Sequence, residues 1–200
     1  QVTIVFLPHG QVAEQNTQRD QQQHIKGDTF AHRGRMDATI IGFILESLAM
    51  IKTQHLFEIS LTVPEIVDVG QTPLGARKIA TVTGGRFEGD RIKGEVMPSP
   101  GGDWLLLRAD NVLTLDVRLT LKTDDNALIY MHYKGLRHGP DEVMARLAKG
   151  EAVDPDSYYF RMAPVFETGS EKYAWINRML CVATGHRLST GPVYQVYEVL

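Results

Sequence analysis

The chain has 200 residues, of which 43% are hydrophobic and 22% charged, and its formal net charge is −3. This is the composition of an ordinary globular protein with one large domain, or one domain plus an extension, and a chain of this length needs neither disulfides nor a structural metal. The single cysteine, Cys181, excludes an internal disulfide and is compatible with a reducing, cytoplasmic compartment. The 21 lysines and arginines are scattered along the chain, so nucleic acid is not an expected partner.

The first 53 residues differ from the rest of the chain. Residues 1–35 are polar and glutamine-rich and show no apolar period, which is typical of a tail or an upstream segment. Residues 36–53 are predicted to form an amphipathic helix or arm, because apolar residues recur at helical spacing and Asp37 is placed to cap the first turn. This helix would dock on the main body or pair with a second subunit. Its β-branched residues are also compatible with a strand. At about fifteen residues, with Glu46 inside, it is too short and too polar to span a membrane.

From residue 54 onward, short strands alternate with turn signals, which predicts an antiparallel meander. One helix is expected between Pro140 and Gly150, where Asp141 and Glu142 suit the positive N-terminal end. About nine strands with so little helix predict a mainly β fold. A single closed barrel is favoured over a sandwich, because closure removes exposed strand edges. The candidate strands are 55–63, 78–83, 91–97, 104–108, 112–122, 127–134, 158–165, 175–184 and 192–199.

The hairpin around residues 124–126 can be assigned in detail. Apolar and polar residues alternate along 112–122, and the sequence Asp-Asp-Asn suits a three-residue loop whose last residue, Asn126, adopts the left-handed conformation. A two-residue loop would instead turn the polar residues of the second strand in among the leucines. The three-residue loop pairs Thr120 with Tyr130, Arg118 with His132 and Asp116 with Lys134 on one polar face.

This polar face carries an acid, a guanidinium, a phenol and an imidazole, which are the groups of acid–base chemistry. Asp116 or His132 would move a proton, Tyr130 would assist as a donor, and Arg118 would hold a developing oxyanion. The pattern alone fits the wet outer wall of a barrel better, where such residues contribute little and titrate normally. Both interpretations stay open at this point.

Several familiar chemistries lack their motifs. No G-x-S-x-G elbow occurs, and the seven histidines form no H-x-H or H-x-x-x-H pair, so neither a serine hydrolase nor a metal centre is expected. The glycines of 84–94 match no phosphate-binding loop, and no cofactor is expected. Cys181 alternates with Met179 and Ala183, as a small buried residue would.

From Leu56 onward the sequence resembles the uncharacterised family called domain of unknown function 3237. The motifs that carry the resemblance are TGGRFEG (83–89), KGEV (93–96), GGDW (101–104), LDVR (115–118), TDD (123–125), ALIY (127–130), YFR (159–161), FETG (166–169) and YAWINR (173–178). Asn126 stands where the family usually has glycine. The resemblance implies a single-domain antiparallel barrel but no activity. It also draws attention to six polar positions: Asp103, Asp116, Arg118, Arg161, Glu167 and Asn177.

Two further pairs complete the expected ligand site. Strand alternation puts Tyr159 with Arg161, and Trp175 with Asn177, on shared faces, where rings and guanidinium would suit a flat, anionic or carbonyl-bearing ligand. A structural ion pair between Arg161 and Glu167 is the alternative. We therefore expect a dimeric barrel that binds a small molecule in its lumen. It would act as a cofactor-independent lyase, isomerase or cyclase, as a carrier, or as a structural oligomer.

Overall fold

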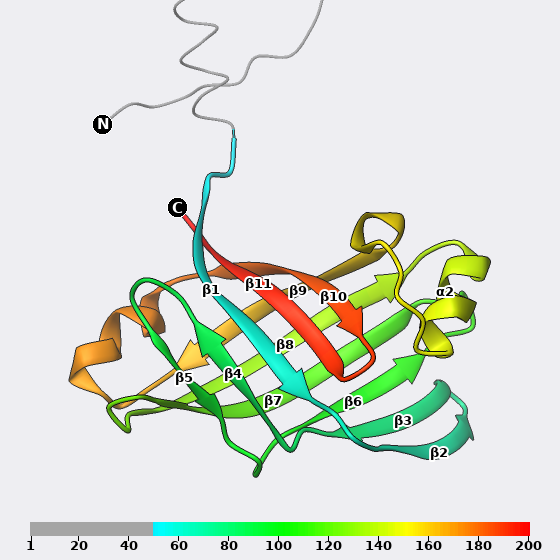
Figure 1. Cartoon of the computed structure of the whole chain (residues 1–200), viewed down its shortest axis with the longest axis horizontal. Coiled ribbons are helices and arrows are strands. Elements are labelled where there is room, and N and C mark those ends of the chain that lie inside the picture. Colours follow the sequence, from blue (N-terminus) through cyan, green and yellow to red (C-terminus); the bar gives the residue numbers. More distant parts are fainter. Residues whose placement is uncertain (1–49) are drawn as a thin grey trace, which may run out of the picture. The chain divides into compact units, whose positions relative to one another are not determined.

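The computed structural model describes residues 50–200, and the predicted tail at 1–35 and nearly all of the predicted arm at 36–53 lie outside the described residues. The described part forms one antiparallel sheet of 11 strands with one α-helix and two short 3₁₀ helices (Figure 1). The strands are β1 (Thr53–Thr62), β2 (Ile66–Thr72), β3 (Gly75–Thr81), β4 (Gly84–Glu88), β5 (Lys93–Val96), β6 (Gly102–Leu107), β7 (Leu113–Thr123), β8 (Leu128–His138), β9 (Tyr159–Glu167), β10 (Cys181–Leu188) and β11 (Gly191–Val199). The helices are α2 (Asp141–Ala148), η1 (Pro155–Ser157) and η2 (Glu171–Arg178).

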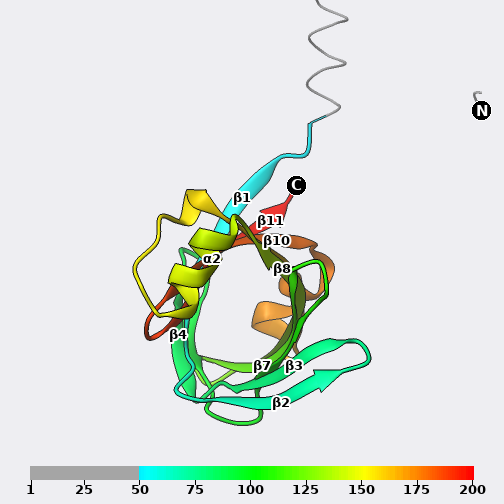
Figure 2. The ribbon, with the colours of Figure 1, turned by 90° about the vertical axis from the view of Figure 1, so that its right-hand side faces the viewer.

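The sheet closes on itself, which confirms the predicted barrel. Its ring runs β7-β5-β4-β1-β11-β10-β9-β8, and β8 pairs back onto β7. Both β5 and β6 pair with the same edge of β7, β5 near Leu121 and β6 near Val117. Because β6 then continues to β3 and β2, these three strands extend beyond the ring, and β2 and β3 project from the wall (Figure 2).

The strand prediction fails at three places for identifiable reasons. The segment that forms β2 lies between turn residues, and β4 begins with Gly84 and Gly85, so neither shows a usable alternation. The strand expected at 175–184 starts only at Cys181, because Trp175 and Asn177 belong to η2. The prediction that Trp175 and Asn177 share one face of a strand was therefore wrong.

The β7–β8 hairpin confirms the predicted register. Asn126 has a φ of 69°, and its backbone N–H donates to the carbonyl of Thr123 at 2.8 Å, so the loop has three residues. The cross-strand pairs are Thr120–Tyr130, Arg118–His132 and Asp116–Lys134.

The α2 helix also forms where the sequence predicts it. Pro140 is its N-cap residue, Asp141 and Glu142 occupy the first turn, and Leu147 is buried. Gly150, with a φ of 76°, follows the helix end in the left-handed conformation that glycine adopts without strain. Within residues 50–200, no helix has the length and apolar character that crossing a membrane requires.

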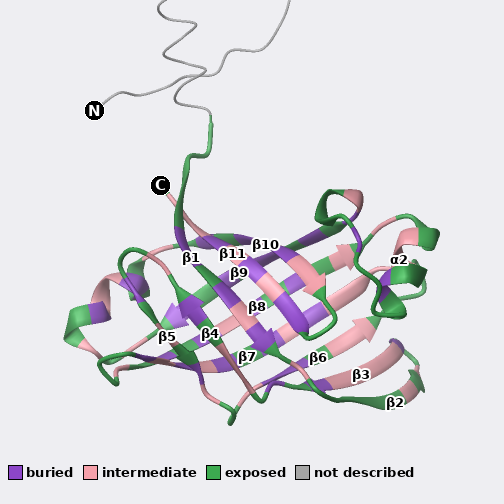
Figure 3. Cartoon of the chain, viewed as in Figure 1, coloured by how far each residue is buried: buried purple, intermediate pink, exposed green. Residues whose placement is uncertain are grey.

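Side chains fill most of the barrel interior. Along β7 and β8 buried residues alternate with more exposed ones, as Figure 3 shows by colour. The ring of Phe57 lies 5.5 Å from that of Phe87 and 5.7 Å from that of Phe166, measured between centroids. These rings pack the interior as a hydrophobic core, and a cavity remains at the end near α2, where β1 terminates.

Candidate functional site

The polar face of β7 and β8 lies on the outer wall of the barrel. Arg118 and Tyr130 are exposed, and Asp116 and His132 are half-buried, whereas the alternate residues of both strands are buried inside. The sequence left two interpretations of this face open, and the structure supports the outer wall. The enzyme interpretation required these four side chains to face an enclosed cavity, and they do not. Their participation in a reaction stays a prediction.

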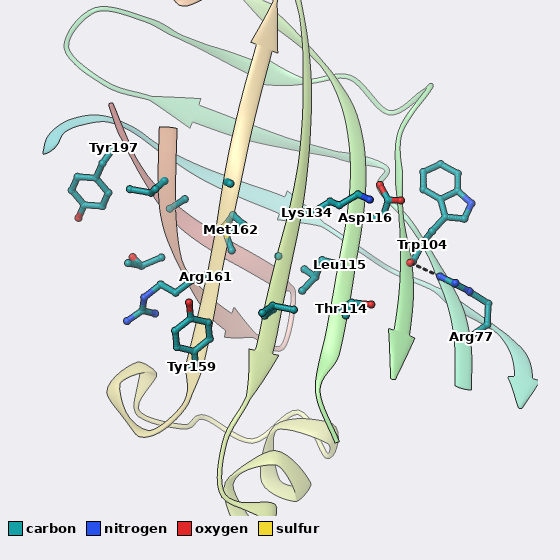
Figure 4. Close-up of a pocket in the computed structure, with 16 residues that line it drawn as sticks. Arg77, Trp104, Thr114, Leu115, Asp116, Lys134, Tyr159, Arg161, Met162 and Tyr197 are labelled. Carbon is teal, nitrogen blue, oxygen red and sulfur yellow. Dashed lines mark hydrogen bonds between the residues drawn. The ribbon is translucent and has the colours of Figure 1, made fainter. Parts of the chain in front are cut away.

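The predicted residues do not converge on one place. Asp116, Tyr159 and Arg161 line a groove on the outer wall (Figure 4). Tyr130, Glu167 and Asn177 border a separate surface hollow beside η2. The predicted site residues are therefore divided between the groove and the hollow, which are two different features of the surface.

Several of these side chains already have structural partners. Arg118 pairs with Asp116 at 2.9 Å, and the Asn177 side-chain amide holds the backbone of Thr168 through bonds of 2.8 and 2.9 Å. The Arg91 guanidinium lies 3.8 Å from the ring centroid of Trp175. These contacts give three of the predicted ligand-binding residues a structural role.

The alternative ion pair between Arg161 and Glu167 is not formed. Both residues lie on β9, six positions apart. At about 3.3 Å per residue this separates their Cα atoms by roughly 20 Å. The ion-pair interpretation was therefore wrong.

A different polar cluster faces the interior. Four side chains, Asp103 of β6, Tyr133 and Arg137 of β8, and Tyr194 of β11, line a cavity of about 70 Å³ at the α2 end of the barrel, here called the lumen mouth. Tyr133 and Tyr194 are fully buried, and their ring centroids lie 5.6 Å apart in an edge-to-face arrangement. The lumen mouth therefore brings a carboxyl, a guanidinium and two phenols together on the inner face of the barrel.

Strand pairing explains how these side chains point inward. Asp103 lies opposite Val117, and Arg137 lies opposite Phe160, and both partners are interior residues. The guanidinium of Arg137 lies 5.5 Å from the centroid of the Phe160 ring. That ring in turn packs against Gly185, where any Cβ would come within 2.6 Å of it. A glycine on β10 thus lets the aromatic floor of the lumen mouth form.

Burial changes the acid–base properties of the lumen mouth. Loss of solvent raises the pKa of the Asp103 carboxyl to about 7, although a hydrogen bond of 3.1 Å from the Asp116 backbone N–H and the charge of Arg137 oppose the rise. Burial also raises the pKa of Tyr133 well above its ordinary range, and it lowers the pKa of Arg137. Asp103 is therefore the carboxyl whose two protonation states are both populated near neutral pH.

Two polar atoms at the lumen mouth are left without partners. Tyr133 Oη and Arg137 Nε are buried and form no well-aligned hydrogen bond among residues 50–200, although the Tyr194 hydroxyl lies close enough to Tyr133 to add to the rise in its pKa. Buried polar groups are nearly always hydrogen-bonded in folded proteins. Two unsatisfied donors on one cavity wall indicate a place where a ligand oxygen or a water would bind.

The sequence analysis did not identify this cluster, for a different reason at each residue. Tyr133 falls in phase with Met131 and so counted as core, while Arg137 lies beyond the predicted strand end at 134 and Asp103 just before the predicted start at 104. Asp103 stood out only through the family resemblance. Strand alternation could have revealed that Arg137 faces the interior. It lies four residues after Tyr133 on the same strand, so the two side chains share a face.

The described residues offer no metal centre and no reactive thiol. No group of three His, Cys, Asp or Glu side chains in residues 50–200 is arranged to hold a metal ion. Cys181 is buried, and burial raises the pKa of its thiol to about 11.

The fold and this site define a class, a closed antiparallel β-barrel with a polar cluster inside one mouth. The sequence profile of the family described as "Protein of unknown function (DUF3237)" matches residues 51–199, and the chain belongs to that family. The UPF0311 protein RPA1785 of Rhodopseudomonas palustris is 34% identical over 150 residues, 75% of this chain and 97% of the relative.

Solved structures agree with this assignment. The crystal structure of RPA1785 matches with a TM-score of 0.71 over 76% of this chain and 98% of its own. A "beta-barrel like protein" from Acinetobacter baumannii AYE is 37% identical, with a TM-score of 0.66 over 76% of this chain and 97% of its own. A structure described as an enzyme from Penicillium herquei covers 75% of this chain and 95% of its own, with a TM-score of 0.57; at 22% identity it shows a shared fold alone.

Proposed function

We propose that the lumen mouth binds a small, partly hydrophobic or aromatic molecule and places its carbonyl or carboxylate group between Asp103 and Arg137. The observation that carries the proposal is the pair of unpartnered donors, Tyr133 Oη and Arg137 Nε, beside a buried carboxyl. A buried polar atom without a partner costs about 1–3 kcal/mol. A ligand oxygen that accepts from both donors recovers that free energy.

The size of the cavity limits what enters it. Ligand pockets usually measure about 300–1,000 Å³, whereas the lumen mouth has about 70 Å³. Only a head group fits inside. The hydrophobic body of the ligand would rest on Val63, Ile66 and Leu105, which line the outer part of the same cavity.

The arrangement supports proton transfer without a cofactor. A general acid or base works best when its pKa lies near the working pH, as that of Asp103 does. The Asp103 carboxylate would take a proton from the carbon beside the ligand carbonyl, so that a C–H bond breaks and an O–H bond forms. The resulting enolate oxygen accepts from Arg137. The Asp103 proton then returns to another carbon in an isomerase or goes to the departing group in a lyase. In a cyclase the enolate carbon bonds to a carbonyl carbon of the same ligand, and the oxygen of that carbonyl takes the proton. This is the chemistry of a cofactor-independent isomerase, lyase or cyclase.

The same cavity without turnover would make the protein a carrier. Asp103→Asn separates the two, because asparagine keeps the acceptor for the Asp116 N–H but cannot move a proton. Retained binding with lost turnover supports the enzyme. Retained binding in a protein that never turns a bound compound over supports the carrier.

Thermal-shift and calorimetric titration with aromatic acids, phenols and lactones tests the binding. Compounds that bind the folded protein raise its Tm by mass action. We expect Arg137→Gln and Tyr133→Phe to weaken binding by about tenfold or more each, with folding checked by circular dichroism. Arg86→Gln, an exposed arginine on β4 away from the lumen mouth, is the matched control and should leave lumen binding unchanged. Binding that survives both lumen variants and is lost in the control would overturn the proposal.

A further inference from the structure

We propose a second binding site, on the outer wall, for an elongated flat anion such as an aromatic dicarboxylate. It is the groove of about 870 Å³ shown in Figure 4, here called the outer groove, and it lies on the outer wall of the barrel. Its principal side chains are Arg77, Trp104, Thr114, Lys134, Tyr159 and Arg161.

Strand register gives the outer groove its length. Arg161 and Arg77 stand on β9 and β3, with β8, β7 and β6 between their strands, and the groove continues past Arg161 to Val182 and Tyr197. Four strand spacings of about 4.8 Å separate their Cα atoms by roughly 19 Å. In Figure 4 the Arg77 side chain lies beside Trp104, and the Arg161 side chain lies beside Tyr159 on the far side of β9. The stretch of wall between the two strands suits a ligand of one or two fused rings with an anionic group at each end.

The floor of the outer groove includes a small outward residue. Ala163, which lies opposite Lys134 on the neighbouring strand, is exposed and adds only a methyl group. A larger side chain at this position would fill part of the groove. Gly135 also borders the groove through its backbone, but it belongs to the inner face of β8 with Tyr133.

Three cations line the outer groove without an acidic partner. None of Arg77, Lys134 and Arg161 forms an ion pair with a carboxylate within residues 50–200. The acid among the lining residues, Asp116, already pairs with Arg118 at 2.9 Å. The chain as a whole carries a formal charge of −3, so this local excess of positive charge is a property of the groove.

The two arginines are held in position by carbonyl groups. Arg77 Nη1 donates to the carbonyl of Trp104 at 2.8 Å, drawn as a dashed line in Figure 4, and Arg161 Nη1 donates to the carbonyl of Phe160 at 2.9 Å. A guanidinium has five N–H groups in a fixed plane, so these bonds orient the cation and leave donors for an anion.

Aromatic rings flank the groove beside both arginines. Trp104 is 39% exposed and Tyr159 is 43% exposed, although the Tyr159 ring stacks on His138, with 4.9 Å between centroids. The Arg161 guanidinium lies 5.4 Å from the ring centroid of Tyr159. Exposed rings beside fixed cations offer stacking area and charge to a flat anion. A second copy of the same face fits less well, because it would bring like charges together.

Fluorescence titration with naphthalene-2,6-dicarboxylate tests the outer groove, with the uncharged naphthalene-2,6-dicarboxamide as the ligand control. We expect saturable binding of the dicarboxylate that weakens about tenfold or more in Arg161→Gln and in Ala163→Phe, which fills the floor. Arg86→Gln, an exposed arginine on β4 outside the groove, is the matched control and should bind like the unmodified protein. Tyr133→Phe should also leave this binding unchanged, which separates the outer groove from the lumen mouth.

Three results would overturn the outer groove as an anion site. The first is equal binding of dicarboxylate and dicarboxamide. The second is binding that Arg161→Gln and Ala163→Phe leave unchanged. The third is a dimer in sedimentation that Ala163→Phe dissociates while the dicarboxylate fails to bind, which would make this face a contact between copies of the chain.

Discussion

Asp103 and Arg137 line the same lumen cavity, yet no ion pair joins them among the described residues. An acid and a guanidinium that share a small enclosed space usually pair directly. Here each side chain has another contact. The Asp103 carboxylate accepts a hydrogen bond from the Asp116 backbone N–H, and the Arg137 guanidinium lies beside the Phe160 ring. The gap between them is the feature that the proposed ligand head group would fill.

The first prediction concerns the pH dependence of stability. Burial raises the pKa of Asp103 from 3.8 to about 7, so between these values the unfolded chain binds fewer protons than the folded one. Stability should therefore fall as pH rises from about 4 to about 7, by up to about 4 kcal/mol from this group. Asp103→Asn removes the dependence, and urea unfolding of both proteins from pH 4 to 8 measures it. The same decline in the variant would show that Asp103 is not its source.

The second prediction compares two buried tyrosines. Tyr133→Phe removes a hydroxyl without a partner and should leave stability unchanged or raise it by about 1–2 kcal/mol. Tyr158→Phe removes the acceptor of a 2.9 Å hydrogen bond from the Arg187 backbone N–H and should lower stability by about 1 kcal/mol. Urea unfolding at a fixed pH compares them. A larger loss in Tyr133→Phe than in Tyr158→Phe would mean that the Tyr133 hydroxyl has a structural partner.

The third prediction concerns the β7–β8 loop. Asn126 has a φ of 69°, a conformation that alanine adopts at a cost of about 1–2 kcal/mol. Asn126→Gly should fold as stably as the unmodified chain, whereas Asn126→Ala should lose about 1 kcal/mol. Denaturant midpoints give both values. Equal stability of the two variants would contradict the left-handed assignment.

The fourth prediction concerns the contact that ties this loop to η2. Hydrogen bonds from Lys172 at 2.6 Å, from Thr123, and from Tyr173 at 2.9 Å hold the pKa of Asp125 well below its usual range. A lowered pKa stabilises the fold above the ordinary value of 3.8, and this contribution is lost as pH falls toward the folded-state value. Asp125→Asn should therefore have a lower Tm than the unmodified chain at pH 6, and the difference should shrink at pH 3. A difference that stays constant with pH would point to packing instead of charge.

The sequence was most informative where one local rule controls the structure. Period-two alternation and a single loop residue, Asn126, determined the register of β7 and β8, and the structure confirms each predicted pair. The order of strands around the ring was not predictable in this way. The choice of β7 as partner for both β5 and β6 depends on contacts between distant parts of the chain.

The site was harder to predict because a polar residue inside a barrel contradicts the alternation that reveals strands. Tyr133 reads as core, and Asp103 and Arg137 lie at strand ends, where the pattern is weakest. Conversely, the conspicuous polar face at Asp116 and Arg118 proved to be the outer wall. Which face of a strand looks inward follows from closure, and closure is a property of the whole sheet.

The pKa of the Asp103 carboxyl is the measurement that tests the account most directly. Carbon-13 NMR of protein labelled at the aspartate carboxyl carbon follows each titration in the folded chain. We expect one carboxyl with a midpoint near 7, absent in Asp103→Asn and shifted when a lumen ligand is bound. If the Asp103 signal titrates below about 5, in the ordinary range for aspartate, the lumen mouth is not the acid–base site proposed here.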